Sequence, residues 1–413
     1  MTSDAYDNIA PSASGNDRAL EAGNGIVRFA PAWVPRAFCT PGKRIRLHPD
    51  DYFPLGYGRG GIDERWLASS IRADNGPETG DHEGMSLVLD PDGGLLPFDD
   101  FVAHHKADLL GARLWDAFGG WTMYSKFYDN LMPLPFHVHH SDEKAALVDK
   151  VGKPEAYYYS PHMNDNLGMQ PISFFGFQPD VTKEQVKERL RRFEQGGDNR
   201  ITDLALGYRT QLGTGWDIPA GVLHAPASIC TYEPQSASDV FAMCESWSNN
   251  KEVPQDLLWK DVPAEHHGDY DFIIDLLDWD KNVDPHFVGN RFMVPYETAT
   301  SAADGGTAYQ EKWIVFRSNS FSAKELTVKP GQTVTIVDED AYGALFVQGG
   351  GTFGGHDAQA ATLIRYGQLS QDEFFVSAAA AKAGVTITNR SATDDIVILK
   401  HFGPGNVELG PVG

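Results

Sequence analysis

LPFHVHHSDEKAALVDKVGKPEAYYY, residues 134–159, is the part of this chain around which the other segments are arranged. It contains a His-x-His pair, His137 and His139. Residues two apart on a β-strand point to the same face, so these two imidazoles can hold one metal ion. Glu155 in the same stretch and His224 in the distant segment IPAGVLHA can complete the ligand set. The sequence therefore predicts a site of three histidines and one glutamate, a set that suits Zn²⁺ and also Mn²⁺ or Fe²⁺.

Other histidines fit this site less well. His140 adjoins the pair, but on a strand it would point to the opposite face. His104 and His105 fall in FDDFVAHHKADLLG, whose apolar spacing predicts a helix, and we interpret them as helix-surface residues. His48 and His162 lie outside any ligand pattern, and we interpret them as ordinary structural histidines.

Composition narrows the classes of function. The chain has 413 residues, which predicts two or three domains, and 41% hydrophobic residues, enough for large cores. Its net charge of −23 argues against nucleic acid and anionic membranes as partners and leaves a small molecule. Neither a signal-peptide pattern nor a long apolar run occurs. Cys39, Cys230 and Cys244 are too few for a disulfide framework, so we expect reduced cysteines and a cytoplasmic protein.

The order of segments predicts a mainly β protein. After Trp121, short aromatic and branched runs between Pro and Gly predict the strands of a sandwich or barrel. One helix interrupts them in PDVTKEQVKERLRRFEQGG, where Thr182 and Gln185 form a capping box. Residues 252–290 are acidic with apolar islands such as FIIDLLDW, and we expect helical cover there.

Composition also suggests domain boundaries. Residues 1–25 are small, polar and glycine-rich, which predicts a disordered tail. Residues 26–296 contain all four predicted ligands, and residues 297–310 have the composition of a linker. Residues 311–413 form strands and turns without a His-x-His pair, so we predict a C-terminal barrel with no metal ligands.

The predicted ligands lie in phrases that resemble type I phosphomannose isomerases, which are zinc-dependent enzymes of the cupin superfamily. The similar phrases are PFHVHHSDEKA, GKPEAYYY, WDIPAGVLHAPASICTYEPQSASD and, upstream, ERWLASS…GMSLVLDPDGGLLPFDDFV…LLG. Their order and spacing hold over residues 58–247. The resemblance implies two cupin (jelly-roll) β-barrels with an inserted helical segment, and isomerisation of an aldose to a ketose through an enediol. Mannose and fructose, as sugar phosphates or free sugars, are the implied substrates.

The resemblance also implies a catalytic residue. Lys153 stands where the family has the lysine of its GKxE segment. Moving a proton between adjacent sugar carbons needs a Lewis acid and a positioned acid/base, and a lysine beside the metal suits the second role. Tyr157 and Tyr159, near the site, would suit stacking on a sugar face.

Three positions differ from the family pattern. His137 replaces a glutamine ligand, and Pro135 replaces a serine that binds the substrate phosphate in the family. No arginine occurs over residues 241–243, where the family has a catalytic one. These differences bring a free sugar or a related polyhydroxy acid into consideration.

Two other functions remain open. Three histidines and a glutamate also occur in cupin oxygenases and decarboxylases that use iron or manganese. The missing arginine would equally suit a non-catalytic cupin that binds a sugar.

Overall fold

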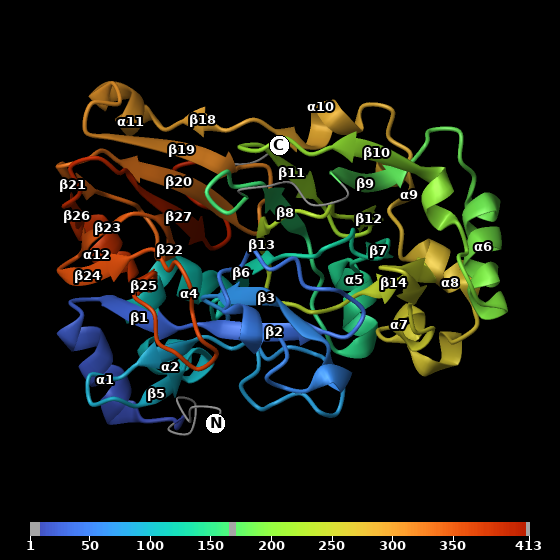
Figure 1. Ribbon diagram of the computed structural model, residues 1–413, viewed down its shortest axis with the longest axis horizontal. Helices are drawn as coiled ribbons and strands as arrows, with labels where there is room; N and C mark the ends of the chain where they lie inside the picture. Colours follow the sequence, from blue (N-terminus) through green and yellow to red (C-terminus); the bar gives the residue numbers. More distant parts are fainter. Residues whose placement is uncertain (1–8, 165–170, 410–413) are drawn as a thin grey trace.

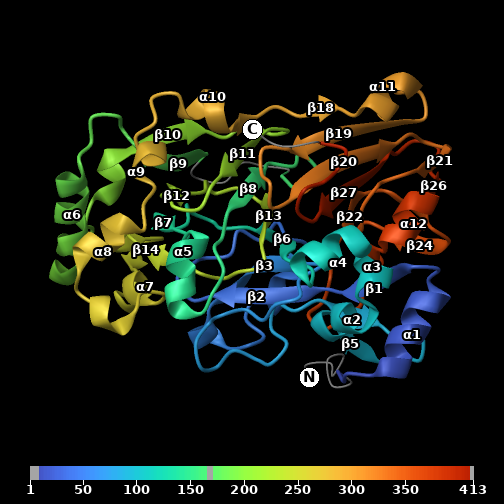
Figure 2. The ribbon, with the colours of Figure 1, turned by 180° about the vertical axis from the view of Figure 1, so that it is seen from behind.

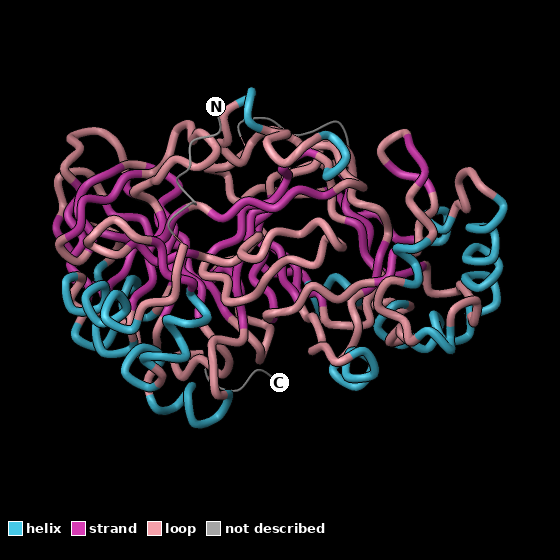
Figure 3. The backbone as a smooth tube through the Cα atoms, turned by 90° about the horizontal axis from the view of Figure 1, so that it is seen from below, coloured by secondary structure: helices cyan, strands magenta, loops and turns pink. Residues whose placement is uncertain are grey.

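The computed structural model describes residues 9–164 and 171–409, and within them the fold is mainly β. Five sheets are present in these residues, and the strands paired in them are antiparallel (Figure 1). Most of the helices lie outside the strands, many of them toward the two ends of the molecule, as Figure 3 shows from below. The sequence prediction of a mainly β protein is thus confirmed.

Two sheets carry the predicted ligands. The larger has seven strands, in the order β17 (Phe292–Met293), β11 (Gly215–Ile218), β8 (Glu155–Tyr158), β13 (Thr231–Ser236), β6 (Met123–Tyr128), β3 (Gly61–Leu67) and β2 (Ala32–Arg36). The smaller has five strands, in the order β10 (Ala205–Arg209), β9 (Ile172–Phe177), β12 (His224–Ala225), β7 (His137–Val138) and β14 (Ala242–Met243).

Helices cover the five-stranded sheet on the side away from the ligands. They are α6 (Lys183–Arg191), α7 (Asp256–Trp259), α8 (Tyr270–Asp275) and α9 (Trp279–Asn282), grouped at one end of Figures 1 and 2. Val186 and Leu190 of α6 and Ile273 of α8 belong to one buried apolar cluster with Val138 and Phe177 of the sheet. This packing gives the sheet a dry outer face. It confirms the predicted helical cover.

The capping box at the start of α6 is also confirmed. The Thr182 hydroxyl accepts a hydrogen bond from the backbone N–H of Gln185, and the Gln185 side chain accepts one from the backbone N–H of Thr182. The helix is followed by a short 3₁₀ turn and ends at Gly196, whose φ of 74° suits glycine.

Apart from the short pair of β15 (Trp247–Ser248) and β16 (Lys251–Glu252), the remaining strands lie toward the other end of the molecule (Figure 1). The largest sheet has nine, in the order β18 (Tyr296–Glu297), β19 (Tyr309–Val315), β20 (Ser322–Val328), β27 (Ile396–Phe402), β22 (Tyr342–Gln348), β25 (Glu373–Val376), β1 (Ile26–Ala30), β4 (Leu87–Leu89) and β5 (Leu95–Pro97). A four-stranded sheet follows the order β21 (Thr333–Ile336), β26 (Val385–Asn389), β23 (Gly350–Phe353) and β24 (His356–Gln359). A short pair joins β15 to β16.

Chain segments far apart in sequence share the nine-stranded sheet. Strand β1 pairs with β25, with Ile26 opposite Val376 and Val27 opposite Phe375. On its other side β1 pairs with β4. The N-terminal strands therefore extend the sheet formed by the C-terminal residues.

Helices around this end are short. They are α2 (Phe98–His105), α3 (Ala107–Leu110), α4 (Ala112–Phe118) and α12 (Ala378–Ala383); α5 (Asp142–Ala145) and α10 (Phe287–Arg291) lie nearer the ligands along the chain. The predicted helix around His104 and His105 is confirmed, but it is broken at Lys106, whose φ is 52°. None of the helices described in residues 9–164 and 171–409 is long and apolar enough to cross a membrane.

Two segments differ from their prediction. Within residues 1–25, predicted as a disordered tail, Ala13–Ala22 forms helix α1, capped by the Ser12 hydroxyl and packed near α2; residues 1–8 lie outside the described residues. Within residues 297–310, predicted as a linker, Ala299–Asp304 forms helix α11, capped by the Thr298 side chain and packed on β19. Both segments are short and polar, so their composition does not indicate a helix. Tertiary contacts stabilise the helices that form there.

Candidate metal centre

The four predicted ligands meet where the two ligand-bearing sheets face each other. His137 of β7 and His224 of β12 are directly opposite each other in the five-stranded sheet. Ligand atoms of His137, His139 and His224 all lie within 4.8 Å of one another. Glu155, from β8 of the other sheet, reaches His139 Nε2 and His224 Nε2 at 2.9 Å each. The structure thus brings the four residues predicted from the sequence close together.

Backbone carbonyls fix the orientation of the three imidazoles. Nδ1 of His137 lies 2.7 Å from the carbonyl oxygen of Pro135, Nδ1 of His139 lies 2.7 Å from that of Val240, and Nδ1 of His224 lies 2.8 Å from that of Val222. A carbonyl only accepts hydrogen bonds, so each Nδ1 donates and each Nε2 keeps its lone pair. This is the arrangement that metal-binding histidines require.

The protonation states of the site suit a cation. Burial lowers the pKa of His139 to about 3, and the charge of Lys153 acts in the same direction. Burial, followed by the neighbouring imidazoles of His224 and His139, lowers the pKa of His137 well below its usual range. Burial alone would raise the pKa of Glu155, but Lys153, His139 and His224 hold it well below its usual range. Neutral imidazoles and an ionised carboxylate are the ligand forms of these side chains.

Unpartnered atoms point to the same conclusion. Both carboxylate oxygens of Glu155 and Nε2 of His224 are buried without a hydrogen-bond partner among the described residues. A Glu155 oxygen and a deprotonated Nε2 are both acceptors, so the 2.9 Å between them is unfavourable unless a cation lies between. The donor set thus fits a divalent metal of the zinc type.

Lys153 lies against this group. Its Nζ is 2.9 Å from His139 Nε2 and 3.1 Å from Glu155 Oε2. The side chain is almost fully buried, so water has little access to the ammonium group. Lys153 can therefore exchange a proton with a molecule bound at the ligand group.

The two predicted substrate-binding tyrosines are placed differently from each other. The ring of Tyr157, on the same strand face as Glu155, lies 6.2 Å from the ring of His224. Burial and then the charge of Glu155 raise the pKa of Tyr157 well above its usual range, so its phenol stays neutral. Tyr159 is fully buried and its hydroxyl lies 3.0 Å from Ser173 Oγ. Tyr157 thus adjoins the ligand group, while Tyr159 packs against Tyr157 and Ser173.

Sequence reasoning missed a buried charge network behind Lys153. Glu233 of β13 lies 3.8 Å from Lys153 Nζ and 3.2 Å from Lys126 Nζ, and Lys126 in turn lies 3.2 Å from Glu64. Burial and then the charge of Glu155 raise the pKa of Glu233 well above its usual range. Residues Thr231 to Gln235 of β13 are all buried, so alternation along the strand does not mark Glu233, and its partners come from distant strands.

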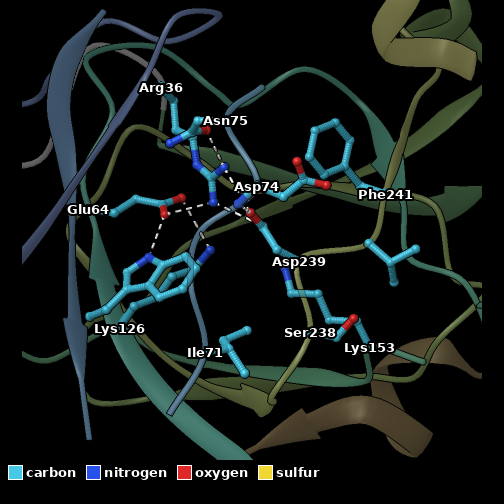
Figure 4. A network of polar contacts seen from close by, with 12 residues as sticks. Arg36, Glu64, Ile71, Asp74, Asn75, Lys126, Lys153, Ser238, Asp239 and Phe241 are labelled. Carbon is cyan, nitrogen blue, oxygen red and sulfur yellow. Dashed lines mark hydrogen bonds and ion pairs between the residues drawn. The ribbon is translucent and has the colours of Figure 1, made fainter. Parts of the chain in front are cut away.

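Arg36 occupies the other end of the network. Its guanidinium donates two hydrogen bonds to Asp239, at 2.9 and 3.1 Å, one to Glu64 at 3.1 Å and one to Asn75 at 2.7 Å (Figure 4). Asp239 precedes Val240, whose carbonyl orients His139. Arg36 therefore anchors the segment that holds one of the candidate ligands.

The remaining histidines stay outside the ligand group. Nε2 of His140 lies 3.0 Å from the carbonyl oxygen of Asp261, and Nδ1 of His162 lies 2.8 Å from Gln348 Oε1. His104 pairs with Asp17 at 2.7 Å, and these two with His105 form a second group whose ligand atoms lie within 4.8 Å, with Asp17 and His104 exposed. The distinction drawn from sequence between His139 and its neighbour His140 is confirmed by the geometry.

Comparison with known proteins places the fold. No protein-family profile and no curated protein sequence matches the chain. Among solved structures, the chain is similar to the mannose 6-phosphate isomerase of Bacillus subtilis, with a TM-score of 0.61 and 13% identity over 91% of this chain and 99% of the other. A variant of phosphomannose isomerase from Salmonella typhimurium gives a TM-score of 0.62 and 10% identity over 92% of this chain and 100% of the other.

A third structure holds metal. It is a mannose 6-phosphate isomerase bound with zinc and yttrium, with a TM-score of 0.61 and 11% identity over 92% of this chain and 100% of that one. These likenesses extend over nearly the whole chain at low sequence identity. The chain has the fold of the mannose-6-phosphate isomerases, at a large distance from them in sequence.

Proposed function

We propose that this protein is a metal-dependent isomerase that interconverts an aldose and a ketose of the mannose and fructose type through an enediol. One observation carries the proposal: Lys153 Nζ lies within 3.1 Å of two of the four convergent candidate ligands. A metal held by these ligands would lie next to a proton carrier, which is what proton transfer between adjacent sugar carbons requires. The fold shared with sugar-phosphate isomerases supports the same reaction.

In this proposal the four ligands are His137, His139, Glu155 and His224, and the metal is zinc, with manganese or iron(II) as the other candidates. When bound, the metal would polarise the oxygens on the two reacting carbons. The ligand set of three histidines and one glutamate leaves coordination positions for those oxygens.

The chain's own residues handle the proton. In its neutral amine form, Lys153 would take the proton from the carbon next to the carbonyl and become an ammonium group. It would return that proton to the former carbonyl carbon while the hydroxyl proton passes between the two neighbouring oxygens, which converts the aldose to the ketose. Glu233 and Glu155 flank the ammonium group on two sides and limit where it can point. Burial of these side chains keeps water from exchanging with the transferred proton.

The aromatic residues of β8 would shape the site. Tyr157, beside His224, is the one placed to meet a sugar face or hydroxyl. Tyr159 would act by holding Tyr157, since their ring centroids are 6.4 Å apart.

The domain assignment belongs to the same proposal. Residues 26–296 would form the catalytic unit, a cupin barrel with helical insertions, and residues 311–413 a second jelly-roll barrel without metal ligands. The structural likeness to a mannose 6-phosphate isomerase over more than nine-tenths of the chain supports this arrangement.

The direct experiment is metal analysis of the purified protein together with isomerisation assays on mannose, fructose and their 6-phosphates. Isomerisation that disappears on chelation and returns with metal supports the proposal. The ligand set of three histidines and a glutamate also suits an oxygenase or decarboxylase. Bound iron with oxygen consumption and no isomerisation would replace the proposal with that function. Tight zinc and sugar binding without turnover would indicate a non-catalytic sugar-binding protein.

A further inference from the structure

A cavity of about 840 Å³ adjoins the chain segment that positions His139. Its wall includes Phe241 and Asp261, and the Asp261 carboxylate accepts a hydrogen bond from the backbone N–H of Phe241. The residue before Phe241 is Val240, whose carbonyl orients His139. The backbone carbonyl oxygen of Asp261 also accepts a hydrogen bond from the ring of His140. The consecutive residues Val240 and Phe241 therefore connect the cavity wall to the candidate metal centre.

A second side of the cavity connects to the same network. Asn75, in the wall, accepts a hydrogen bond from Arg36, and Asp74 donates its backbone N–H to Asp239 (Figure 4). Lys150, also in the wall, lies three residues before Lys153. The cavity wall is thus joined by hydrogen bonds to Arg36 and Asp239, which anchor the segment that orients His139.

The charged side chains that line this cavity carry a net negative charge. Three cations lie in its wall against four carboxylates; the cations are Arg59, Lys150 and Lys260, and the carboxylates are Asp74, Glu78, Asp256 and Asp261. A phosphate dianion needs cations whose charge is not already compensated. This wall adds up to a net negative charge before any ligand enters.

Each of the three cations already has carboxylate partners. Lys150 Nζ lies 2.6 Å from Asp74 and 2.5 Å from Asp261, and Lys260 Nζ lies 3.0 Å and 3.4 Å from the same two groups. Arg59 holds both oxygens of Glu83, at 2.7 and 2.8 Å. A phosphate would have to displace these carboxylates while remaining next to them.

The same wall suits an uncharged ligand rich in hydroxyls. Carboxylates accept and ammonium groups donate hydrogen bonds, so Asp74, Lys150 and Lys260 can serve neighbouring hydroxyls at once. Phe38 and Phe241, whose ring centroids are 6.0 Å apart, supply apolar surface for the C–H face of a sugar.

We infer that this cavity binds an unphosphorylated polyhydroxy compound, a free hexose or its open-chain polyol, in preference to a sugar phosphate. The inference rests on the proposed function for its biological meaning, since it names the class of sugar that the isomerase takes. It does not rest on turnover for its test, because binding is measured separately.

Mannitol and mannitol 1-phosphate are suitable probes, since neither has a carbonyl group and neither can be isomerised. Calorimetric titration of the full chain should show mannitol binding, with mannitol 1-phosphate weaker. The variant Asp74→Asn removes one wall carboxylate at a half-exposed position, so the fold should tolerate it. It should shift the affinity ratio toward the phosphorylated ligand by about three- to fivefold, the range for weakening a partly exposed ion pair.

Asp357→Asn is the matched control. It makes the same change in net charge at an exposed residue of β24, outside the cavity. Its ratio should equal that of the unmodified protein. An equal shift in both variants, tighter binding of mannitol 1-phosphate to the unmodified protein, or no binding of either probe would overturn the inference. Mannitol binding as described, with no isomerisation of any hexose, would leave the inference standing and reject the proposed function.

Discussion

At the scale of single residues, the candidate metal centre depends on which nitrogen of each imidazole is free. Backbone carbonyls hold Nδ1 of His137, His139 and His224, so three Nε2 atoms converge with Glu155. His139→Ala removes one of these and also a contact of Lys153. We expect metal content and isomerase activity to be lost together while the fold remains. Elemental analysis and circular dichroism of this variant, with His162→Ala as control, check it; full metal occupancy would remove His139 from the ligand set.

Lys153 is expected to act after the metal is bound. Because its ammonium group competes with a cation for His139 and Glu155, Lys153→Ala should retain metal. Turnover should fall by about 10²–10⁴-fold, the usual contribution of a positioned acid/base. The exposed Lys382→Ala is a control at a surface lysine. Equal kcat in the two variants would exclude a catalytic role for Lys153.

Part of the site could be predicted from sequence because of strand periodicity. His137 and His139 lie two residues apart, so a strand places them on one face, and the same rule separates His140. The network of Arg36, Lys126 and Glu233 could not be predicted in this way. These residues lie far apart in sequence and become neighbours only through the pairing order of the strands.

At the scale of elements, the contact between β22 and β27 depends on a glycine. Gly343 is opposite His401, and a Cβ at residue 343 would lie 2.1 Å from Nε2 of that ring. The ring is buried, so it cannot move aside into water. Gly343→Ala should reduce the free energy of unfolding by about 1–3 kcal/mol, the usual cost of overpacking. Urea unfolding measures it against Gly94→Ala, where the nearest atom is 3.7 Å away; similar stability of both variants would contradict this account.

The same histidine predicts a pH dependence. Burial lowers the pKa of His401 to about 3. The hydroxyl of Tyr232 lies within hydrogen-bond distance of His401 Nδ1, at 2.9 Å. The unfolded chain takes up this proton below about pH 6.5, but the folded protein does not until about pH 3, so stability falls as pH falls through this window.

His401→Asn lacks the titrating ring and should lose less stability than the unmodified protein between pH 6.5 and 5, by about 2 kcal/mol. The comparison isolates this group, since the other buried histidines are common to both proteins. Urea unfolding at several pH values measures the difference. Parallel pH profiles would show that His401 does not contribute to acid sensitivity.

Some elements could be predicted and others could not. Helix α6 has a capping box and apolar residues at helical spacing, so local sequence determines it. Helices α1 and α11 lie in polar, glycine-containing stretches that resemble a tail and a linker. Their stability comes from packing on α2 and β19, which composition does not record.

At the scale of the whole molecule, a buried ion pair joins the N-terminal and C-terminal strands. Arg65 of β3 donates two hydrogen bonds to Asp372, both at 2.8 Å, and one to Glu373 of β25 at 3.1 Å. Arg65→Met would leave these carboxylates buried without their cation. We expect about 3–5 kcal/mol lower stability, the usual cost of breaking a buried pair from one side.

The nine-stranded sheet predicts that the loss of stability in Arg65→Met affects both parts of the chain. Because β1 pairs with β25 inside it, the N-terminal and C-terminal parts should unfold in one transition. Fluorescence and circular dichroism in urea should therefore shift together in Arg65→Met. The exposed pair of Arg390 and Asp357 offers the control Arg390→Met, which should change little. Two separated transitions in the unmodified protein would contradict a shared cooperative unit.

The central claim is that the convergent histidines and Glu155 hold a metal that serves sugar isomerisation beside Lys153. Its most direct test is the interconversion of mannose and fructose by the purified protein, followed with metal content before chelation, after chelation and after adding zinc back. The account predicts about one divalent metal per chain for a single ligand group of this kind, with activity that disappears and returns with it. Full isomerase activity in the metal-free protein, or a fully loaded protein that isomerises neither the free sugars nor their 6-phosphates, would contradict it.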